Sequence, residues 1–225
     1  MNRWVLLDTV DVPGSGGQLR LLRRDTEFVI KVGPHELMNS RVSHSEVALA
    51  QLACARIAGM PKPRVLIGGL GMGFTLRAAL AALAADATVV VAELVPAVVA
   101  WNRGPLAEVA GKSLTDWRVS VREIDVARLI RAERAAYDAI LLDVDNGPEG
   151  MTRDSNDRLY DLGGLGAAYD ALRPGGVLAV WSAGPDKSFT QRLHKTGFSV
   201  EEVIVRANGI RGGARHTIWL ATHDE

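Results

Sequence analysis

The feature that most constrains the fold is a regular alternation of apolar segments and helical patterns that begins at Arg64. Aliphatic residues dominate five segments, residues 64–69, 87–94, 118–124, 137–144 and 175–182. Apolar residues at helical spacing predict helices between and after them, at about 73–85, 96–102, 126–133, 158–172 and 187–196. Continuous apolar strands separated by helices are typical of a parallel sheet that is buried on both faces. We therefore predict an α/β domain.

The C-terminal part departs from this alternation. Residues 198–206 and 216–222 both have strand character, and no helical pattern separates them. A short connection cannot form the crossover that parallel strands need, so we predict an antiparallel hairpin at one edge of the sheet. A mostly parallel seven-stranded sheet with an antiparallel C-terminal hairpin resembles the Rossmann-like fold of S-adenosylmethionine-dependent methyltransferases. Nicotinamide-binding domains usually stay parallel.

The first 40 residues form a separate unit in this interpretation. Residues 3–11 and 18–32 have strand character, and a turn-rich segment that contains Pro13 and Gly17 joins them. We predict a small N-terminal β-hairpin unit at residues 1–40 and a Rossmann-like catalytic domain at residues 41–225. Ser43 and Glu46 have the spacing of a capping box, which predicts that a helix begins here.

Charge and cysteine content exclude several classes of function. Lysine plus arginine and aspartate plus glutamate both total 26, so no basic field exists to attract nucleic acid or an anionic membrane. Cys54 is the only cysteine, which rules out an internal disulfide and a multi-cysteine metal site. The apolar run at the N-terminus is too short for a signal peptide, and charges interrupt the apolar region from Ala78 to Trp101. We expect a cytoplasmic protein that binds a small molecule and no metal.

A glycine-rich turn follows the first strand of the α/β domain. Gly69, Gly71 and Gly73 lie where small residues let the backbone approach a ligand and where free N–H groups face it. Glu93 follows 20 residues after Gly73, at the end of the next strand, where an acid can bind both hydroxyls of a ribose. The pattern predicts a nucleoside site that includes the neighbouring Leu94. The alternative is a tight turn and a solvated acid.

Two further strands end in acidic residues. Asp125 ends the third strand and can accept a hydrogen bond from an adenine amino group, with Ile124 beside it; as an alternative it caps the next helix. Asp143 and Asp145 follow the fourth strand, close to the switch point where open α/β sheets bind ligands. Together with Asn146 they predict a site for a cationic substrate. The alternative is an Asx-type turn with exposed acids.

These segments together resemble the spermidine synthase (polyamine aminopropyltransferase) family across nearly the whole chain. The resemblance rests on the N-terminal strands, the glycine loop and five short segments in the family's order, which are SHSEVALAQLA, AELVP, REID, YDAILLDVDNGP and LRPGGVLAVW. It implies a transferase of polyamine biosynthesis that uses decarboxylated S-adenosylmethionine and a small-molecule amine, and it implies a homodimer.

The resemblance also assigns roles to individual residues. It implies that Asp143 is the catalytic acid, that Glu93 binds ribose and that Asp125 binds adenine. His44 and Glu46 take the places of residues that line the family's amine pocket; the alternatives are a solvent-facing His44 and a capping role for Glu46. Trp181, at the end of the fifth strand, is a candidate wall of the acceptor pocket or a packing residue.

The chain departs from the family at its glycine loop. The family loop carries an aspartate that helps to hold the cationic aminopropyl tail, whereas Leu70, Gly71 and Met72 supply no acid here. Because such an aspartate also repels the carboxylate of S-adenosylmethionine, its absence leaves open an S-adenosylmethionine-dependent small-molecule methyltransferase. A non-catalytic nucleoside-binding protein is the third hypothesis.

Overall fold

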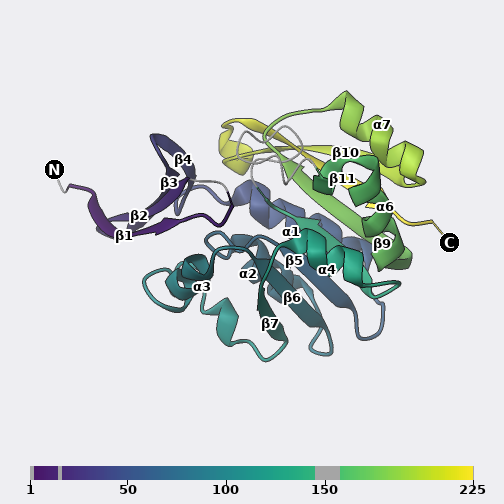
Figure 1. Ribbon diagram of the computed structural model, residues 1–225, viewed down its shortest axis with the longest axis horizontal. Helices are drawn as coiled ribbons and strands as arrows, with labels where there is room; N and C mark the ends of the chain where they lie inside the picture. The colour runs from purple at the N-terminus through teal and green to yellow at the C-terminus, as the bar shows by residue number, and fades with distance from the viewer. Residues whose placement is uncertain (1–2, 15–16, 145–157, 225) are drawn as a thin grey trace.

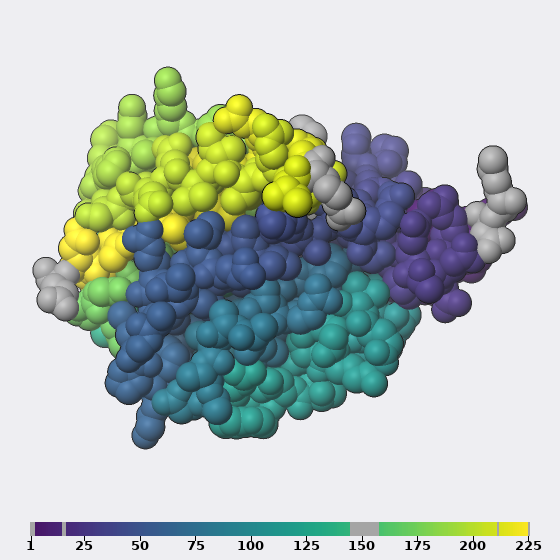
Figure 2. All heavy atoms as spheres, turned by 180° about the vertical axis from the view of Figure 1, so that it is seen from behind, coloured from purple at the N-terminus to yellow at the C-terminus, as the bar shows by residue number. Residues whose placement is uncertain are grey.

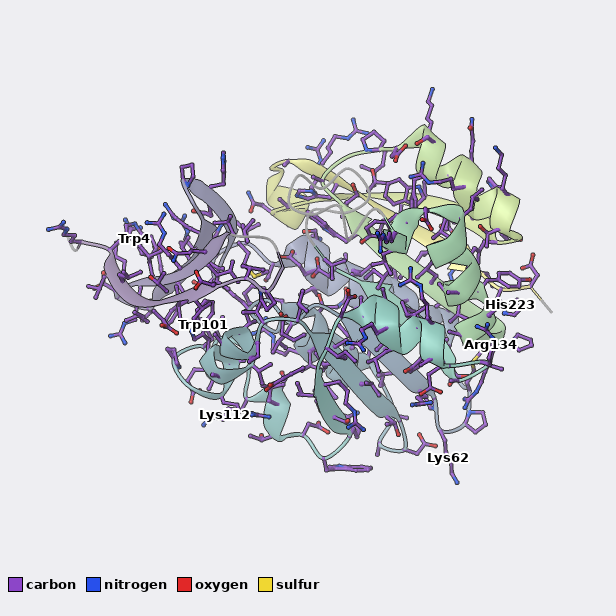
Figure 3. The ribbon with its side chains drawn as sticks, viewed as in Figure 1. Trp4, Lys62, Trp101, Lys112, Arg134 and His223 are labelled. Carbon is purple, nitrogen blue, oxygen red and sulfur yellow. The ribbon has the colours of Figure 1, made fainter. Side chains whose placement is uncertain are left out.

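The computed structural model describes residues 3–14, 17–144 and 158–224. They form two units, a small antiparallel sheet near the N-terminus and a larger α/β domain with the C-terminus at its far end (Figure 1). From behind, the small sheet again projects from one end of the larger domain (Figure 2). Trp101 lies on the side of the larger domain that is next to the small sheet (Figure 3). Its Nε1 donates a 2.7 Å hydrogen bond to Oδ2 of Asp8, which joins the two units.

The N-terminal unit has four antiparallel strands in the order β1-β2-β3-β4. Their bounds are β1 Val5–Asp11, β2 Gln18–Arg24, β3 Glu27–Val32 and β4 His35–Asn39. The predicted hairpin is therefore present but is only half of the unit. Residues 18–32 are two strands instead of one, because Asp25, with φ of 53°, reverses the chain between them. β4 is short and has no clear apolar alternation, so the sequence did not predict it.

The large sheet confirms the predicted methyltransferase-like topology. Its order is β10-β11-β9-β8-β5-β6-β7, and all its pairs are parallel except those of β11 with β9 and with β10. The strands are β5 Arg64–Gly68, β6 Thr88–Glu93, β7 Val119–Glu123, β8 Tyr137–Leu142, β9 Leu172–Ser182, β10 Ser199–Arg206 and β11 Arg215–Thr222. The C-terminal hairpin thus closes one edge, as the short connection between its strands predicts.

Helices cover both faces of this sheet. Their bounds are α1 His44–Arg56, α2 Phe74–Ala82, α3 Pro96–Arg103, α4 Val126–Ala132, α6 Leu162–Ala171 and α7 Lys187–Thr196, with 3₁₀ turns η1 Ser113–Thr115 and η2 Gly209–Arg211. Side chains alternate along each strand, so Val65 and Ile67 belong to the core under α1 and α2, while Leu66 belongs to the core under α4 and α6. The sheet is therefore the middle of three layers, and its strand ends are free to carry a site.

Two helix starts differ from the sequence prediction. Ser43 is the N-cap residue of α1, but its side chain makes no capping hydrogen bond, so the capping box does not form. The helix predicted at 158–172 is interrupted at Asp161, whose Oδ1 accepts from the backbone N–H of Gly164 and starts α6 there. In the described part of the chain, no helix has the length and apolar character that crossing a membrane requires.

Candidate functional site

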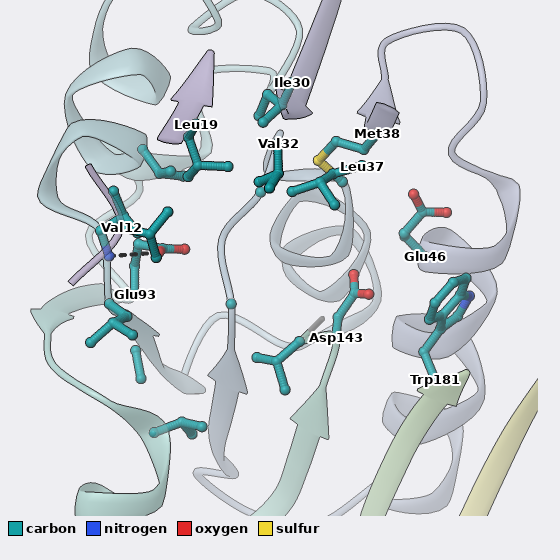
Figure 4. A pocket seen from close by; sticks show the side chains of 18 of the residues that line it. Val12, Leu19, Ile30, Val32, Leu37, Met38, Glu46, Glu93, Asp143 and Trp181 are labelled. Atoms are coloured by element: carbon teal, nitrogen blue, oxygen red, sulfur yellow. Dashed lines mark hydrogen bonds between the residues drawn. The ribbon is translucent and has the colours of Figure 1, made fainter. Parts of the chain in front are cut away.

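A cavity of about 650 Å³ lies at the carboxyl ends of β5, β6 and β8. The N-terminal unit forms its opposite wall, which is mostly apolar (Figure 4); its apolar side chains are Val12, Leu19, Ile30, Val32, Leu37 and Met38. The wall on the α/β domain includes most of the predicted site residues and carries, among apolar side chains, four acidic ones, Glu46, Glu93, Asp125 and Asp143. Aliphatic side chains on one wall therefore exclude water, and acidic side chains on the other wall are available to a ligand.

The glycine loop contributes only backbone to this cavity. Gly69 and Gly71 line it, with φ of 87° and 51°. A Cβ on Gly69 would lie 2.6 Å from the carbonyl oxygen of Asp143, and a Cβ on Gly71 would lie 2.8 Å from Sδ of Met38. Neither position can therefore carry a side chain without moving its neighbours.

The third predicted glycine has a different role. Gly73 is not among the lining residues; a Cβ there would lie 2.8 Å from Cβ of Ala110, and φ is 77°. Its lack of a side chain lets α2 begin close to the segment that follows α3. The side chains of Leu70 and Met72 are buried in the core, with 5% and 0% exposure. No acidic group therefore reaches the cavity from residues 69–73.

Glu93 ties the glycine loop to the end of β6. Its Oε2 accepts a 2.8 Å hydrogen bond from the backbone N–H of Leu70, and its Oε1 accepts a 2.9 Å bond from the N–H of Val95. Each oxygen of a carboxylate can accept more than one hydrogen bond. Because these bonds fix the carboxylate in place, it is a preorganised acceptor at the cavity wall.

The next strand end continues the same wall. Leu94, Ile124 and Asp125 all line the cavity. Oδ1 of Asp125 accepts a 2.8 Å hydrogen bond from the N–H of Ala127, so this residue is also the N-cap of α4. The two roles considered for Asp125 are therefore compatible in one position.

Asp143 lies near the middle of the cavity, between Glu93 on one side and Glu46 with Trp181 on the other (Figure 4). It directly follows β8, and its Oδ2 accepts a 2.9 Å hydrogen bond from Oγ1 of Thr75. Burial is the main cause that raises the pKa of Asp143 to about 7; the charge of Glu46 adds to the increase, and the bond from Thr75 opposes it. Asp143 is thus a carboxyl group that can exchange a proton near neutral pH.

Glu46, Trp181 and His216 form the far end of the cavity. Oε2 of Glu46 accepts a 2.7 Å hydrogen bond from the buried hydroxyl of Ser45. The ring of His216 packs on that of Trp181 with centroids 4.8 Å apart. Burial lowers the pKa of His216, whereas the charge of Glu46 and a backbone hydrogen bond with Ala183 oppose this decrease. The imidazole is therefore held mostly neutral at pH 7 next to a carboxylate.

The charges around the cavity have one sign. Five acidic residues line it, whereas no lysine or arginine does so within residues 3–14, 17–144 and 158–224; the acids are Glu36, Glu46, Glu93, Asp125 and Asp143. Across the same residues, no group of three or more potential ligands has the arrangement of a metal site. A cavity with this charge attracts cations and repels anions.

The structure brings together most of the residues predicted from the sequence, with four exceptions, of which Gly73 is described above. His44 is exposed and is not among the lining residues; its ring lies beside Gly209, the first residue of η2. Asp145 and Asn146 lie outside the described residues. Sequence reasoning did not identify Thr75 and His216, although Thr75 follows the glycine loop within the first turn of the next helix, where side chains commonly face a ligand.

Comparisons with known proteins agree with this geometry at the level of the fold. No protein-family model matches the chain, and no curated protein matches it in sequence. The solved spermidine synthase from Thermotoga maritima matches it with a TM-score of 0.76 and 18% identity, over 97% of this chain and 72% of that chain. The chain has the spermidine synthase fold. A spermidine synthase in complex with the transition state analogue AdoDATO gives a TM-score of 0.75 and 18% identity over the same shares of both chains.

A third match has the same spermidine synthase fold at lower similarity. The probable spermidine synthase from Corynebacterium glutamicum ATCC 13032 gives a TM-score of 0.65 and 15% identity, over 97% of this chain and 80% of that chain. All three matches therefore include the N-terminal sheet as well as the α/β domain. The shared fold does not by itself define the reaction, which must be argued from the side chains of the cavity.

Proposed function

We propose that this protein is an aminopropyltransferase that uses decarboxylated S-adenosylmethionine and a small amine acceptor. The observation that carries the proposal is the acidic cavity, in which Asp143 lies between a nucleoside-binding end at Glu93 and a second acid at Glu46. Both substrates of this reaction are cationic, and the described lining residues include five acids and no lysine or arginine. The AdoDATO complex of a protein with this fold supports the same donor class.

The residues at one end of the cavity fit the adenosyl part of the donor. Backbone N–H groups hold Glu93 at the cavity wall, at the end of a parallel strand, where a carboxylate can bind a ribose diol. Leu94 and Ile124 give apolar surface for a purine ring, and Asp125 can accept from its amino group. Gly69 and Gly71 let the tail pass close to the backbone because neither has a side chain there.

Asp143 has the properties that the acceptor amine requires of a base. The donor supplies a carbon that is activated by the adjacent sulfonium, so the leaving group departs as a neutral thioether. An alkylamine with a pKa near that of lysine is protonated at pH 7, and freeing its lone pair costs roughly 4 to 5 kcal/mol. The Asp143 carboxylate attracts this ammonium and accepts its proton, and its pKa of about 7 makes it a stronger base than an ordinary carboxylate.

The surrounding groups orient this step. Thr75 holds Oδ2 of Asp143, which leaves Oδ1 as the oxygen that we assign to the acceptor nitrogen. The charge of Glu46 attracts both cationic substrates, and the stacked rings of Trp181 and His216 form the wall behind it. Positioning of the nitrogen in line with the reacting carbon supplies the rest of the rate increase.

One observation favours methyl transfer from S-adenosylmethionine as a second candidate. The glycine loop presents no acid to the cavity, because Leu70 and Met72 are buried and Gly71 lies under Met38. Without a loop acid, a chain with this fold lacks one means of repelling the carboxylate of S-adenosylmethionine. The absence of a lysine or arginine from the described lining argues the other way, since this carboxylate would then have no cationic partner there.

Product analysis separates these candidates. The purified protein is incubated with a mixture of diamines and either decarboxylated S-adenosylmethionine or S-adenosylmethionine, and the nucleoside products are identified by mass spectrometry. We expect methylthioadenosine from the decarboxylated donor and no S-adenosylhomocysteine from the other. S-adenosylhomocysteine as the main product would establish the methyltransferase, and binding without any product would establish the nucleoside-binding protein.

A further inference from the structure

We propose that Glu46 excludes the carboxylate of S-adenosylmethionine from the cavity and thereby selects the decarboxylated donor. This inference rests on the proposed function and names the residue that sets its donor specificity. It assigns to a helix, α1, the task that the resembling family gives to an aspartate in the glycine loop.

The glycine loop cannot perform this selection. Gly71 has a φ of 51°, which disfavours a side chain, and a Cβ there would also displace the end of Met38, whose Sδ would lie 2.8 Å away. Leu70 and Met72 point into the core, so the loop offers the donor tail only backbone groups and no charge. A selecting charge must therefore come from another element that faces the same part of the cavity.

Glu46 is in the right place to supply it. The backbone of Asp143 lies against the loop, since its N–H donates a 3.1 Å hydrogen bond to the carbonyl oxygen of Gly68 and its own carbonyl oxygen leaves no space for a Cβ on Gly69. Glu46 is close enough to Asp143 to act on its charge, and both side chains project into the cavity (Figure 4). The buried hydroxyl of Ser45 orients the Glu46 carboxylate.

Charge repulsion gives this position its effect. Glu46 and Asp143 already place two carboxyl groups near each other in a partly dehydrated cavity, and only His216 among the described lining residues could carry a compensating positive charge. A donor carboxylate would be a third acid in the same space and would lose hydration without gaining a cation. The decarboxylated donor has an ammonium group and no carboxylate in its tail, so the same carboxyl groups attract it.

The test is a calorimetric comparison of both donors with matched variants. The wild-type protein should bind decarboxylated S-adenosylmethionine at least about tenfold more tightly than S-adenosylmethionine. In Glu46→Gln, which keeps the shape and an oxygen that Ser45 can reach, this ratio should fall by about tenfold or more, with a gain in affinity for S-adenosylmethionine. Glu108→Gln removes the same charge from an exposed pair with Lys112 outside the cavity and should leave the ratio unchanged.

The controls separate this inference from the proposed function. Methylthioadenosine lacks both the carboxylate and the ammonium group of the donor tail. It should therefore bind the wild type and Glu46→Gln with similar affinity, which would show that the site is intact. If Glu46→Gln leaves the donor ratio unchanged and raises only the KM of the amine acceptor, then Glu46 belongs to the acceptor site and the inference is overturned while the proposed function stands. A wild-type protein that itself prefers S-adenosylmethionine would overturn the proposed function first.

A second variant keeps the inference testable if Glu46→Gln folds poorly. Ser45→Ala removes the hydroxyl that orients Glu46 but keeps the charge. We expect it to lower the donor ratio in the same direction by a smaller factor. An unchanged ratio in every correctly folded variant at positions 45 and 46 would contradict the role of Glu46 in donor selection.

Discussion

Thr75 Oγ1 donates a 2.9 Å hydrogen bond to Oδ2 of Asp143. This bond connects the first turn of α2, directly after the glycine loop, to the end of β8. It stabilises the charged form of Asp143, while burial and Glu46 destabilise it. The protonation of the proposed base is therefore set by opposing interactions that can be changed one at a time.

Removal of the Thr75 hydroxyl should make Asp143 harder to ionise. In Thr75→Val the pKa of Asp143 should rise, so the acidic limb of the pH profile of kcat/KM should move to higher pH by roughly half a unit or more, the equivalent of one hydrogen bond of about 1 kcal/mol. Thr115→Val, which removes an exposed hydroxyl that bonds to the carbonyl oxygen of Lys112, is the matched control. An unshifted limb in Thr75→Val would show that this bond does not tune the base.

Removal of the Glu46 charge should have the opposite effect on the same limb. The carboxylate of Glu46 raises the pKa of Asp143, so Glu46→Gln should move the acidic limb of kcat/KM to lower pH. The same variant should lower the pKa of His216 further, because Glu46 favours its protonated form. An NMR titration of the His216 ring measures this second effect, and a pKa increase there would contradict the proximity of these two side chains.

Asp143 should also make the stability of the fold depend on pH. Its pKa is about 4 in an unfolded chain and about 7 in the fold, so its contribution to stability is fully present below pH 4 and is lost as the pH rises through 7. Asp143→Asn lacks this titration. The free energy of unfolding of the variant minus that of the wild type should therefore increase from pH 4 to pH 8, by on the order of 1 to 3 kcal/mol. Urea unfolding at both pH values measures the difference, which would be constant if Asp143 had an ordinary pKa.

Glu93 should be required for both stability and nucleoside binding. Both of its carboxylate oxygens accept backbone N–H bonds, so the amide group in Glu93→Gln would turn an N–H toward one of these donors. We expect a loss of about 1 to 3 kcal/mol in stability and a large loss of affinity for methylthioadenosine. Glu123→Gln, at the exposed end of the neighbouring strand β7, is the control and should change neither quantity strongly. Retained affinity in Glu93→Gln would exclude Glu93 from the ribose site.

The sequence could predict the large domain because its local patterns agree with its topology. The buried strands are continuous apolar runs. The connection between β10 and β11 is too short for a crossover, so its length predicted that these two strands are antiparallel. The N-terminal unit was less predictable. Asp25 turns the chain without a glycine or proline signal, and β4 is five residues long. Such features depend on pairing with neighbouring strands more than on local sequence.

The candidate site was predictable where its residues end parallel strands. Glu93, Asp125 and Asp143 each lie at or just after a strand end, and the carboxyl ends of parallel strands meet at one edge of a sheet. The sequence did not predict His216 as a site residue, because its position beside Trp181 depends on the register of β11 against β9. No local sequence pattern indicates this register. The sequence allowed two roles for Glu46, in the amine pocket or in a capping box. Because Ser43 makes no capping hydrogen bond, the capping box does not form.

The most direct test of the proposed function is a single-turnover measurement with decarboxylated S-adenosylmethionine and a diamine, made on the wild type and on Asp143→Asn. We expect methylthioadenosine and an aminopropylated amine in equal amounts from the wild type. In the variant we expect a rate lower by about 10² to 10⁴, with the affinity for methylthioadenosine changed by no more than a few-fold. A wild type that binds this donor without forming either product, or a variant that turns over at the wild-type rate, would contradict the assignment of Asp143 as the base of an aminopropyl transfer.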